Sequence, residues 1–416
     1  MMQEVLLSSI CDLKNGFAFK SKDYVDSSNT LSCRMSSIRP GGNFDLEHNQ
    51  RFLPDTYAEV YSDYLLNDGD IVIAMTDLAG DPKILGVPTI VNTGGKKLLQ
   101  NQRVGKLVIT DSSKVFIPYL QYALNRPSNK SYYKKFADGG LQINVSKKDI
   151  LNNSVPLPPL DQQKKIAAIL DAADTYRQKT KALIAKYDEL LNSIVYQCLG
   201  DSLNKDLKNI KSGSNEFLED GYSWYSLNEI TEVIADIDHK MPKSVEKGKI
   251  FLSAKDLSDN GELDFSNPKF ISEEDFKHLS RKVKPKKLDV IYSRIGAKLG
   301  KARLVKTDHD FIVSYSCCTI RPKQDIVAPL YLKYILDSEA TLRQASHGTR
   351  GIGVPDLGMG EIRTFKIPVP EKSISKKIVN QLEIIETQKA QAQDSLVQSE
   401  DLFNSLLQRA FKGELI

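Results

Sequence analysis

The sequence contains one short proline motif twice: VPLP at residues 155–158 and IPVP at residues 367–370. The run KKI follows each copy, at residues 164–166 and 376–378, so both pairs are 212 residues apart. Because the chain has 416 residues, this offset is close to half of its length. A solenoid repeats every roughly 20 to 50 residues, so the larger offset indicates duplication of a whole domain together with its tail.

Weaker matches extend the repeat toward the N-terminus of each half. They pair GGLQINV at 139–145 with GTRGIGV at 348–354, PYL at 118–120 with PLYL at 329–332, and GDIVI at 69–73 with LDVIY at 288–292. The offset changes by a few residues between these pairs, as insertions in loops would require. We therefore interpret the chain as two copies of one module, each followed by the same type of tail.

Each module combines short strand patterns with turn signals. The first is predicted to form strands at 71–74 and 87–91 around a polar Gly/Pro loop, and the second to form strands at 290–292 and 302–305 around a basic loop. Amphipathic helices are expected at 117–124 and 330–336. Each module should end at its proline motif, because proline donates no backbone hydrogen bond and interrupts both helices and strands.

A long helix is predicted after each proline motif. Apolar residues recur there at alternating spacings of four and three, and no Gly or Pro interrupts either helix. The expected helix–helix interface consists of Ile166, Leu170, Ala173, Ile184, Leu191 and Ile194 in the first helix and Ile378, Leu382, Ile385, Leu396, Phe403 and Leu406 in the second. Ile169, Tyr176, Leu183 and Leu190 widen the first stripe.

The matching register of the two helices favours an antiparallel coiled coil. From Ile166 to Cys198 such a rod would span roughly 50 Å at about 1.5 Å per residue. The alternative is that each helix packs only on its own module. The predicted fold is thus α+β: two similar mixed α/β modules with pseudo-twofold symmetry, separated by two long antiparallel coiled-coil helices. The expected boundaries are 1–158, a helix at 159–199, a polar linker at 200–221, a second module at 222–370 and a second helix at 371–416.

Composition excludes several classes of protein. Lys and Arg number 57 against 53 Asp and Glu, so the net charge of +4 excludes a histone-like protein, a basic tail and an acidic disordered activator. The N-terminus lacks a signal-peptide pattern, and the longest apolar run is far below the ~20 residues that span a bilayer. The five cysteines show neither CxxC spacing nor a paired framework, so we expect a cytoplasmic protein without a membrane partner.

Motifs of the common catalytic and metal sites are absent from the sequence. There is no GxxxxGK[ST], HExxH or GxSxG motif, and no Asn-Pro-Pro-Tyr or Asp-Pro-Pro-Tyr tetrapeptide of an amino-methyltransferase. The vicinal Cys317 and Cys318 lie in a strand-like run from 311 to 320 and are interpreted as small core residues. We therefore expect a protein without catalysis, without a metal and without a cofactor of its own.

Basic residues are concentrated in one part of the second module. Between residues 240 and 306 the sequence has 17 Lys or Arg against 9 Asp or Glu, an excess twice that of the whole chain. This is either a solvated basic face without a partner or a surface that neutralises phosphates. Two similar modules on paired helices suit an elongated ligand with two separated half-sites, and DNA is the leading candidate.

These motifs resemble the specificity subunit of type I restriction-modification enzymes over essentially the full chain. The matching runs are GFAFKS at 16–21, GDIV at 69–72, GLQ at 140–142, VPLPPL at 155–160 leading to IAAIL at 166–170, and QRAFKGEL at 408–415. Two departures lie in the second half. GTRG at 348–351 lacks the glutamine at the position assigned to Gln142, and SIS at 373–375 replaces DQQ at 161–163.

The resemblance implies a division of labour between subunits. The two modules would be target recognition domains that each read one half of a split sequence in double-stranded DNA, and the helices would set the unread gap. Two methyltransferase subunits, which bind S-adenosylmethionine, would dock on this chain, and restriction subunits would join for cleavage. The chain itself would be non-catalytic.

Loop position and side-chain chemistry supply the candidate DNA contacts. They are Lys20, Arg34, Thr76, Lys83, Arg103, Gln142 and Asn144 in the first module and Lys255, Arg294, Lys298, Lys301, Thr349 and Arg350 in the second. Two other hypotheses remain: a coiled-coil scaffold that binds only proteins, and a stand-alone DNA methyltransferase, which would bind S-adenosylmethionine by itself. A DNA-binding measurement separates the first from a recognition subunit.

Overall fold

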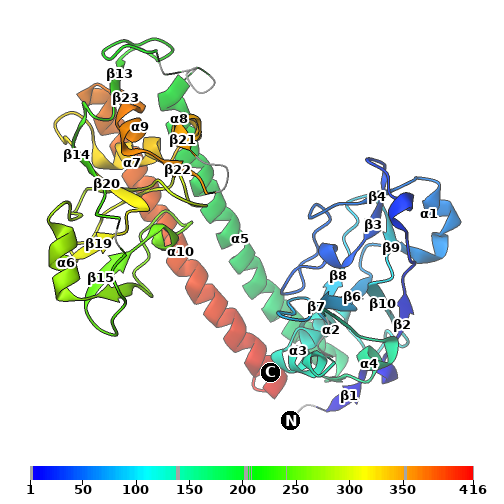
Figure 1. The fold of residues 1–416 in the computed structure, drawn as a ribbon. Helices are drawn as coiled ribbons and strands as arrows, with labels where there is room; N and C mark the ends of the chain where they lie inside the picture. Colours follow the sequence, from blue (N-terminus) through cyan, green and yellow to red (C-terminus); the bar gives the residue numbers. More distant parts are fainter. Residues whose placement is uncertain are drawn as a thin grey trace. The chain divides into compact units, whose positions relative to one another are not determined.

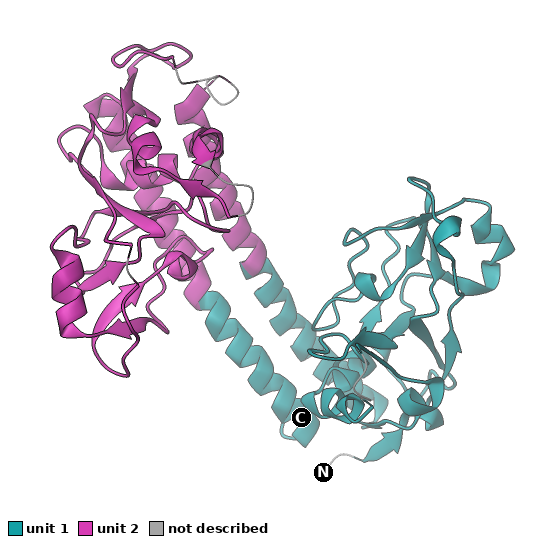
Figure 2. Cartoon of the chain, viewed as in Figure 1, with its two compact units in different colours: residues 1–180, 395–416 teal, residues 181–394 magenta. Residues whose placement is uncertain are grey.

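The computed structural model describes residues 3–136, 141–200, 205, 207, 209–239, 241–350 and 354–415, apart from the side chain of Arg350 (Figure 1). The chain divides into two compact units (Figure 2). Unit 1 consists of residues 1–180 and 395–416, and unit 2 consists of residues 181–394. Each unit therefore contains one module and a part of both long helices.

Unit 1 is built around two four-stranded sheets. The first is antiparallel, in the order β2 (Cys11–Asn15), β10 (Val104–Ile109), β6 (Ile71–Ala74) and β8 (Pro88–Ile90). The second has the order β4 (Phe52–Leu53), β3 (Thr30–Cys33), β9 (Lys97–Gln100) and β5 (Leu65–Leu66), with β3 parallel to β9. The predicted strand at 71–74 and its antiparallel partner are thus confirmed, although β8 is shorter than predicted.

Two-stranded ladders and short helices complete unit 1. The ladders are β1 (Glu4–Leu6) with β12 (Ser154–Pro156) and β7 (Thr76–Leu78) with β11 (Gln142–Asn144). The α-helices are α1 (Tyr57–Val60), α2 (Ile117–Leu124), α3 (Pro127–Lys134) and α4 (Lys147–Leu151). The helix predicted at 117–124 is confirmed at both ends, where Pro118 occupies the first turn and does not need to donate a hydrogen bond.

Unit 2 repeats this plan. Its antiparallel sheet has the order β14 (Thr231–Ala235), β20 (Cys317–Pro322), β17 (Val290–Ser293) and β18 (Ala302–Leu304). In its second sheet β15 (Lys249–Leu252) pairs with β16 (Lys269–Ile271) and, in parallel, with β19 (Phe311–Val313). The ladders are β13 (Tyr222–Ser226) with β23 (Lys366–Pro370) and β21 (Thr349–Arg350) with β22 (Asp356–Leu357), and the helices are α6 (Glu273–Ser280), α7 (Pro329–Leu336), α8 (Glu339–Gly348) and α9 (Met359–Thr364).

The backbone corrects the alignment of one segment of the repeat. The N–H of Val145 donates to Met75 O, and the N–H of Leu357 donates to Arg294 O, each at 2.9 Å. Residues 142–145 therefore correspond to 354–357, at the same offset of 212 as the proline motifs, and the pairing of 139–145 with 348–354 was wrong. Glycine spacing produced that pairing, whereas ladder hydrogen bonds determine which residues are equivalent.

The proline motifs are not the strand breakers that we expected. Pro156 lies inside β12, and Pro368 and Pro370 lie inside β23. Both strands belong to two-stranded ladders, so half of their backbone N–H groups need no partner in the ladder, and proline is tolerated at such edges. The long helices follow after only three residues in unit 1 and one residue in unit 2.

The long helices are α5 (Leu160–Leu199) and α10 (Lys372–Lys412), and they pack together as a coiled coil. In unit 1, Ile166 and Leu170 share a hydrophobic core with Phe403 and Ala410. In unit 2, Leu191 and Val195 share one with Ile378 and Leu382. The start of α5 thus lies beside the end of α10, and the reverse, so the helices are antiparallel.

Both cores also contain strands and helices of the modules, so the long helices pack on each other as well as on the modules, and the alternative that each helix packs only on its own module is wrong. The twelve predicted interface residues are all buried or half-buried. The four residues expected to widen the stripe are instead exposed: Ile169 by 37%, Tyr176 by 55%, Leu183 by 43% and Leu190 by 50%.

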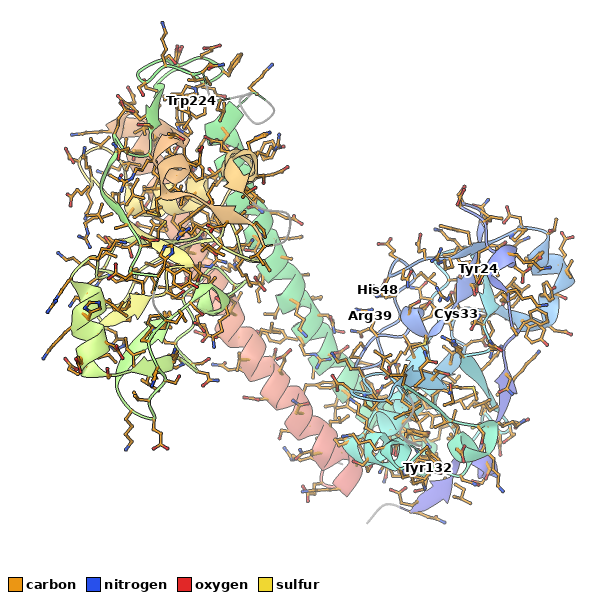
Figure 3. The ribbon with its side chains drawn as sticks, in the orientation of Figure 1. Tyr24, Cys33, Arg39, His48, Tyr132 and Trp224 are labelled. Atoms are coloured by element: carbon orange, nitrogen blue, oxygen red, sulfur yellow. The ribbon has the colours of Figure 1, made fainter. Side chains whose placement is uncertain are left out.

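The linker and the strand-like run at 311–320 differ from their expected structures. Leu207 and Ile210, in the described part of the linker, are buried against Trp224, which is labelled in Figure 3. The indole N–H of Trp224 donates to Glu216 O at 2.8 Å, so the linker is not simply solvated. The strand-like run at 311–320 is two strands, β19 and β20. No helix in the described ranges is long and apolar enough to cross a bilayer.

Truncation of the inner seam should be far more costly than truncation of the outer face. Leu382→Ala removes a side chain that is 1% exposed, and we expect it to lower the free energy of unfolding by about 2–5 kcal/mol, as measured by urea denaturation. The matched control is Ile384→Ala, two residues further along α10 and 49% exposed, which should change it by about 0.5 kcal/mol or less. Equal losses would contradict the burial pattern of α10.

Candidate nucleic-acid interface

In unit 1, the β7–β11 ladder presents polar side chains at the end of the central sheet. The Thr76 hydroxyl is 4% exposed and donates to Asn144 Oδ1 at 2.8 Å, while Gln142 and Asn144 are exposed. Thr76 therefore holds the amide of Asn144 rather than facing solvent itself. Carboxamides can form paired hydrogen bonds with adenine edges, so this ladder is a candidate base-reading element.

Asp77 stabilises the loop after β7 through hydrogen bonds to its backbone. This carboxylate is 6% exposed and accepts hydrogen bonds from the backbone N–H groups of Leu78, Ile84 and Leu85 at 2.8, 2.5 and 3.0 Å. Lys83 extends from this loop, exposed, with Asp81 at 3.4 Å. Lys83 also lines a cavity of about 310 Å³ together with Arg39, which lies after the 3₁₀ turn Met35–Ser37.

A second hollow beside Lys83 contains two basic residues that the sequence reasoning missed. Lys83, Lys130 and Lys134 line a cavity of about 270 Å³, and the last two lie one turn apart on α3. Both are exposed, and neither forms an ion pair with another described residue. Lysines at a spacing of four in residues 127–134 were the available signal. Three lysines gathered in this way can neutralise adjacent phosphates.

The other candidates of the first module lie apart from these groups. Lys20 is exposed at the start of the 3₁₀ turn Ser21–Asp23, and Arg34 is half-buried before the turn at Met35. Arg103 is exposed between β9 and β10, and its backbone carbonyl accepts a hydrogen bond from Met75 at 3.0 Å. None of these three side chains shares a hydrogen-bond partner with Asn144 or Lys83 among the described residues.

Arg294, predicted as a DNA contact, is instead buried. It is 3% exposed, and its guanidinium donates to Asp236 Oδ2 and Asp356 Oδ1, both at 2.9 Å, and to Leu357 O at 3.1 Å. Arg294 follows β17 directly, at the ladder position that Met75 occupies in unit 1, so its side chain points inward. Arg294 lies in the predicted loop between the strands of this hairpin, but the next residue, Ile295, pairs with Asp356, so the Arg294 side chain is held inside the unit, and its predicted DNA contact stays a prediction.

The carboxylate of Asp236 is the main counter-charge of Arg294. Its burial alone would raise its pKa, but hydrogen bonds from Lys282 and His239, and the charges of Lys282 and Arg294, hold the pKa of Asp236 below its usual value. Lys282 Nζ lies 3.1 Å from Asp236 Oδ1. The group therefore stays ionised, and a buried arginine and a buried aspartate neutralise each other.

The Arg294–Asp236 pair contacts two exposed side chains, Asp356 and His239, which were not among the residues predicted from the sequence. The side chain of Asp356 is 54% exposed and that of His239 is 63% exposed, and the His239 ring stacks on Tyr315 with centroids 4.7 Å apart. In the corrected alignment Asp356 corresponds to Asn144, so the offset of 212 applied to Asn144 would have found Asp356 from the sequence. A carboxylate can accept a hydrogen bond from the N4 amine of cytosine, so unit 2 also carries a candidate base-reading group.

The remaining predicted residues of the second module are dispersed. Lys255 is exposed, Lys298 forms an ion pair with Asp259, and Lys301 is exposed before β18. Thr349 is half-buried, and its hydroxyl donates to Ser346 O at 2.9 Å. The backbone of Arg350 belongs to β21, but its side chain lies outside the described residues. None of the described side chains in this set hydrogen bonds to the Arg294–Asp236 pair.

The cysteines and acidic residues provide no chemical centre in the described ranges. Cys317 and Cys318 are buried in β20, and burial raises the pKa of the Cys317 thiol to about 12, so both are core residues as interpreted from the sequence. Within residues 3–136, 141–200 and the other described ranges, no group of three or more His, Cys, Asp or Glu is placed to hold a metal ion.

The fold defines a class of protein with two copies of one α+β module. Each copy carries an equivalent polar ladder that buried side chains support. The family model of the type I restriction modification DNA specificity domain matches residues 1–214 and 234–394. Because the match covers most of the chain, the protein belongs to this family of DNA specificity proteins, and the resemblance found in the sequence motifs is confirmed.

Individual relatives agree with this assignment. The chain is 22% identical over 431 residues to the type I restriction enzyme EcoBI specificity subunit of Escherichia coli, covering 99% of this chain and 85% of the relative. It is 27% identical over 187 residues to the MjaVIII specificity subunit of Methanocaldococcus jannaschii, covering 44% of this chain and 42% of that relative.

Solved structures share the fold. The S subunit of a type I restriction-modification system from M. genitalium has a TM-score of 0.60 at 15% identity, with 99% of this chain and 96% of that chain covered. A chain from a structural study of complex assembly and conformational transition in the type I restriction-modification system has a TM-score of 0.53 at 16% identity, covering 99% and 98%. The α+β fold with two recognition modules and paired long helices is thus confirmed.

Removing Arg294 should destabilise unit 2 rather than merely remove a surface charge. Arg294→Ala removes one side of a buried ion pair and leaves Asp236 with only Lys282 and His239, so we expect a loss of about 3 kcal/mol in the free energy of unfolding, measured by urea denaturation. Lys255→Ala, at an exposed position of the same module, is the control and should be nearly neutral. A neutral Arg294→Ala would show that the guanidinium is not held as described.

Proposed function

We propose that the chain is the non-catalytic DNA-recognition subunit of a type I restriction-modification complex and that its two units read the two halves of a bipartite DNA target. The observation that carries the proposal is the equivalence of two polar ladders: Asn144 in unit 1 and Asp356 in unit 2 occupy the same backbone position. Different side chains on the same backbone suit two different half-sites. The methylation and cleavage activities would then reside in partner subunits.

In unit 1 we assign base reading to Asn144 and Gln142 and phosphate contact to the lysine group. The hydroxyl of Thr76 fixes the orientation of the Asn144 amide, which lowers the entropy lost when that amide meets a base. Lys130 and Lys134 supply positive charge and form no ion pair with another described residue, and Lys83, paired with Asp81 at 3.4 Å, lines the same cavity. Base contacts specify the sequence, and phosphate contacts position the protein.

In unit 2 we assign base reading to Asp356, with His239 and Tyr315 beside it. Arg294 acts as a positioning residue, because it bonds both the carboxylate of Asp356 and the backbone of Leu357. An aspartate facing DNA is repelled by phosphates, so it discriminates only where it meets a donor such as the cytosine amine. In unit 2 we therefore expect the Asp356 carboxylate, oriented by Arg294, to contact the base, rather than Arg294 itself.

Replacing Asn144 should change specificity, and replacing a lysine should change affinity. We expect Asn144→Ala to lose about 1–3 kcal/mol of discrimination at one base pair of the target. We expect Lys130→Gln to weaken binding to every duplex and to reduce the slope of log K against log salt by about 1. The assembled complex would be titrated with its target duplex, found by mapping methylated adenines in the genome, and with all single-base variants of that duplex.

The control is Lys96→Gln, an exposed lysine in the turn between β8 and β9 that lines neither hollow. It should leave both the specificity and the salt slope unchanged. If Asn144→Ala weakened binding to all duplexes equally, base reading by the β7–β11 ladder would be refuted.

We further propose that partner subunits, including two methyltransferase subunits and the restriction subunits, assemble on this chain, and that the outer face of α5 is one docking surface. In unit 2, Leu183 and Leu190 lie seven residues apart and are 43% and 50% exposed although they are apolar. Ile169 and Tyr176 continue this spacing in unit 1, where the Tyr176 hydroxyl hydrogen bonds to Ser395 of α10 at 2.9 Å. A helix with an inner seam and a second apolar stripe is typical of bundles with further helices. The occupant we assign is a helical segment of a methyltransferase subunit.

The free cysteines and the DNA substrate are compatible with a cytoplasmic complex, which is where we propose that it acts. The unread gap between the half-sites would be set by α5 and α10. A helix of 40 residues is about 60 Å long at 1.5 Å per residue, so one such helix has the length of nearly two turns of duplex at about 34 Å per turn.

Charging the outer stripe should abolish assembly while leaving the chain folded. The double variant Leu183→Glu/Leu190→Glu places two carboxylates at positions that are 43% and 50% exposed, so the helix itself should tolerate them. We expect the affinity for the methyltransferase subunit, measured by calorimetric titration, to fall at least tenfold. Lys186→Glu, exposed on the same helix, is the control for added negative charge. Undiminished assembly of the double variant would exclude this docking surface.

A further inference from the structure

Unit 2 contains a cavity that the DNA-recognition proposal does not use. Its volume is about 390 Å³, and its walls come from α7, the residues of α5 and α10 in this unit, the segment 259–262 and the residues around β18. Neither Arg294 nor Asp356 lines it. The volume lies in the range of small-molecule sites, and the walls are rich in charged side chains.

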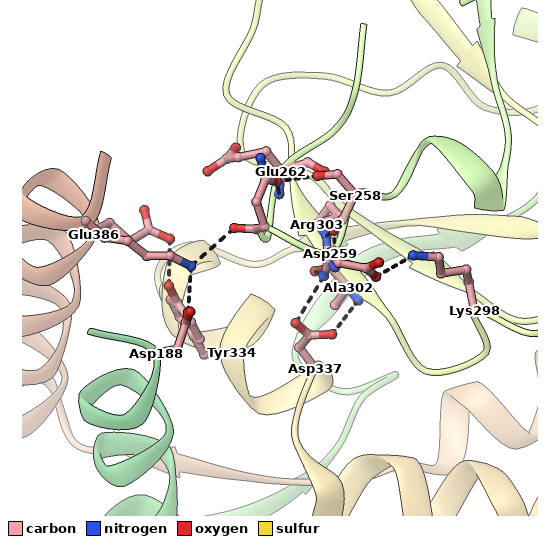
Figure 4. A network of polar contacts seen from close by, with 12 residues as sticks. Asp188, Ser258, Asp259, Glu262, Lys298, Ala302, Arg303, Tyr334, Asp337 and Glu386 are labelled. Carbon is pink, nitrogen blue, oxygen red and sulfur yellow. Dashed lines mark hydrogen bonds and ion pairs between the residues drawn. The ribbon is translucent and has the colours of Figure 1, made fainter. Parts of the chain in front are cut away.

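The carboxylates of this cavity all have partners. Asp337 accepts from Arg303 at 3.0 Å and from the backbone of Ala302, and Glu386 accepts from Tyr334 and Lys306 at 2.8 and 2.9 Å (Figure 4). The other four are matched in the same way: Asp188 with Lys389, Asp259 with Lys298, Glu262 with Lys306 and Glu339 with Arg343. Arg303, 1% exposed, also donates to Ser258 O.

Two of the lining cations have no such partner. Lys301 is exposed at the mouth, and Lys333 is 4% exposed in the wall. Within the described ranges the ammonium of Lys333 forms no hydrogen bond or ion pair, and it lies over the Tyr334 ring, 3.6 Å from the centroid. Burial lowers the pKa of Lys333 to about 8, which reflects the free energy needed to keep an ammonium ion in this position.

In unit 1 the residue at the position of Lys333 has a hydrogen-bond partner within the unit. The hydroxyls of Tyr119 and Tyr331 donate to Pro156 O and Pro368 O, which aligns α2 with α7 and places Gln121 at the position of Lys333. Gln121 Nε2 donates to Gly42 O at 2.8 Å. Unit 1 therefore closes this site with an internal hydrogen bond, whereas in unit 2 the Lys333 ammonium has the charges of Asp337, Glu386 and Glu262 nearby but no hydrogen bond to another described residue.

We propose that this cavity binds a phosphoryl group, with the Lys333 ammonium as the inner contact and Lys301 as the contact at the mouth. Among the described residues, Lys301 and Lys333 are the lining cations without a hydrogen-bonded carboxylate, and lysine binds phosphate as a point charge. Because Lys306 serves both Glu262 and Glu386, the lining charges and their ion-pair partners sum to +1. Either a free phosphorylated small molecule or a backbone phosphate of DNA could supply this group. The volume of about 390 Å³ leaves room for a nucleotide-sized molecule.

The test is a calorimetric titration of the full chain with inorganic phosphate. We expect Lys333→Gln to weaken phosphate binding at least tenfold and Lys301→Gln to weaken it several-fold. Lys277→Gln, on α6, which contributes no wall of the cavity, is the matched control and should bind as the parent chain does. Lys333→Gln introduces the residue that unit 1 already has at this position, so the thermal midpoint should not fall, which separates loss of binding from loss of folding.

A second arm distinguishes the two sources of the phosphoryl group. If phosphate binds and Lys333→Gln leaves the affinity for DNA and its salt slope unchanged, the source is a free small molecule. If Lys333→Gln weakens the binding of the assembled complex to all duplexes and reduces the salt slope, the source is the DNA backbone. The proposal is overturned if the variant binds both phosphate and DNA as the parent chain does, or if neither the parent nor the variant binds phosphate and their DNA affinities agree.

Discussion

Each unit depends on the burial of apolar side chains from both long helices, one from each half of the sequence. The core of unit 1 contains Leu7 and Tyr119 of the module, Ile166 of α5 and Ala410 of α10. Unit 2 is built in the same way around Leu382. A module with only the tail that follows it in sequence would leave one side of this core in water, at a cost of about 25 cal/mol per Å² of apolar surface. The duplicated segment is therefore not the folding unit, and each half completes the other.

Because each core combines segments that are far apart in the sequence, only the features that depend on local patterns could be predicted. The strand at 71–74 and the helix at 117–124 follow from local periodicity, and the seam that contains Leu170 and Leu382 follows from a spacing of four and three. The burial of Arg294 was not predicted, because it depends on backbone hydrogen bonds to distant residues, here Ser316 and Leu357. Its burial requires the charge of Asp236, which lies 58 residues earlier in the sequence and gives no local signal.

The two units provide an internal comparison of one backbone with two sets of side chains. Met75 in unit 1 is replaced by Arg294 in unit 2, and Asn144 is replaced by Asp356. In unit 1 the Thr76 hydroxyl orients the Asn144 amide from the neighbouring strand, while in unit 2 the buried Arg294 guanidinium bonds the Asp356 carboxylate. Because the ladder is common to both units, the differences lie in the side chains that it carries. This is the pattern expected when one fold carries two specificities.

The distribution of charge leads to a different conclusion in three dimensions than along the sequence. Four of the eight excess positive charges between residues 240 and 306 pair with acids outside that segment: Lys284 with Asp310, Lys287 with Asp308, Arg303 with Asp337 and Arg294 with Asp356. Around α3 the sequence has four basic residues and no acidic one between 126 and 136, and Lys130 and Lys134 form no ion pair with another described residue. An ion pair cancels part of the charge that a polyanion meets, so the more basic sequence of the second module does not by itself make that module the more basic surface.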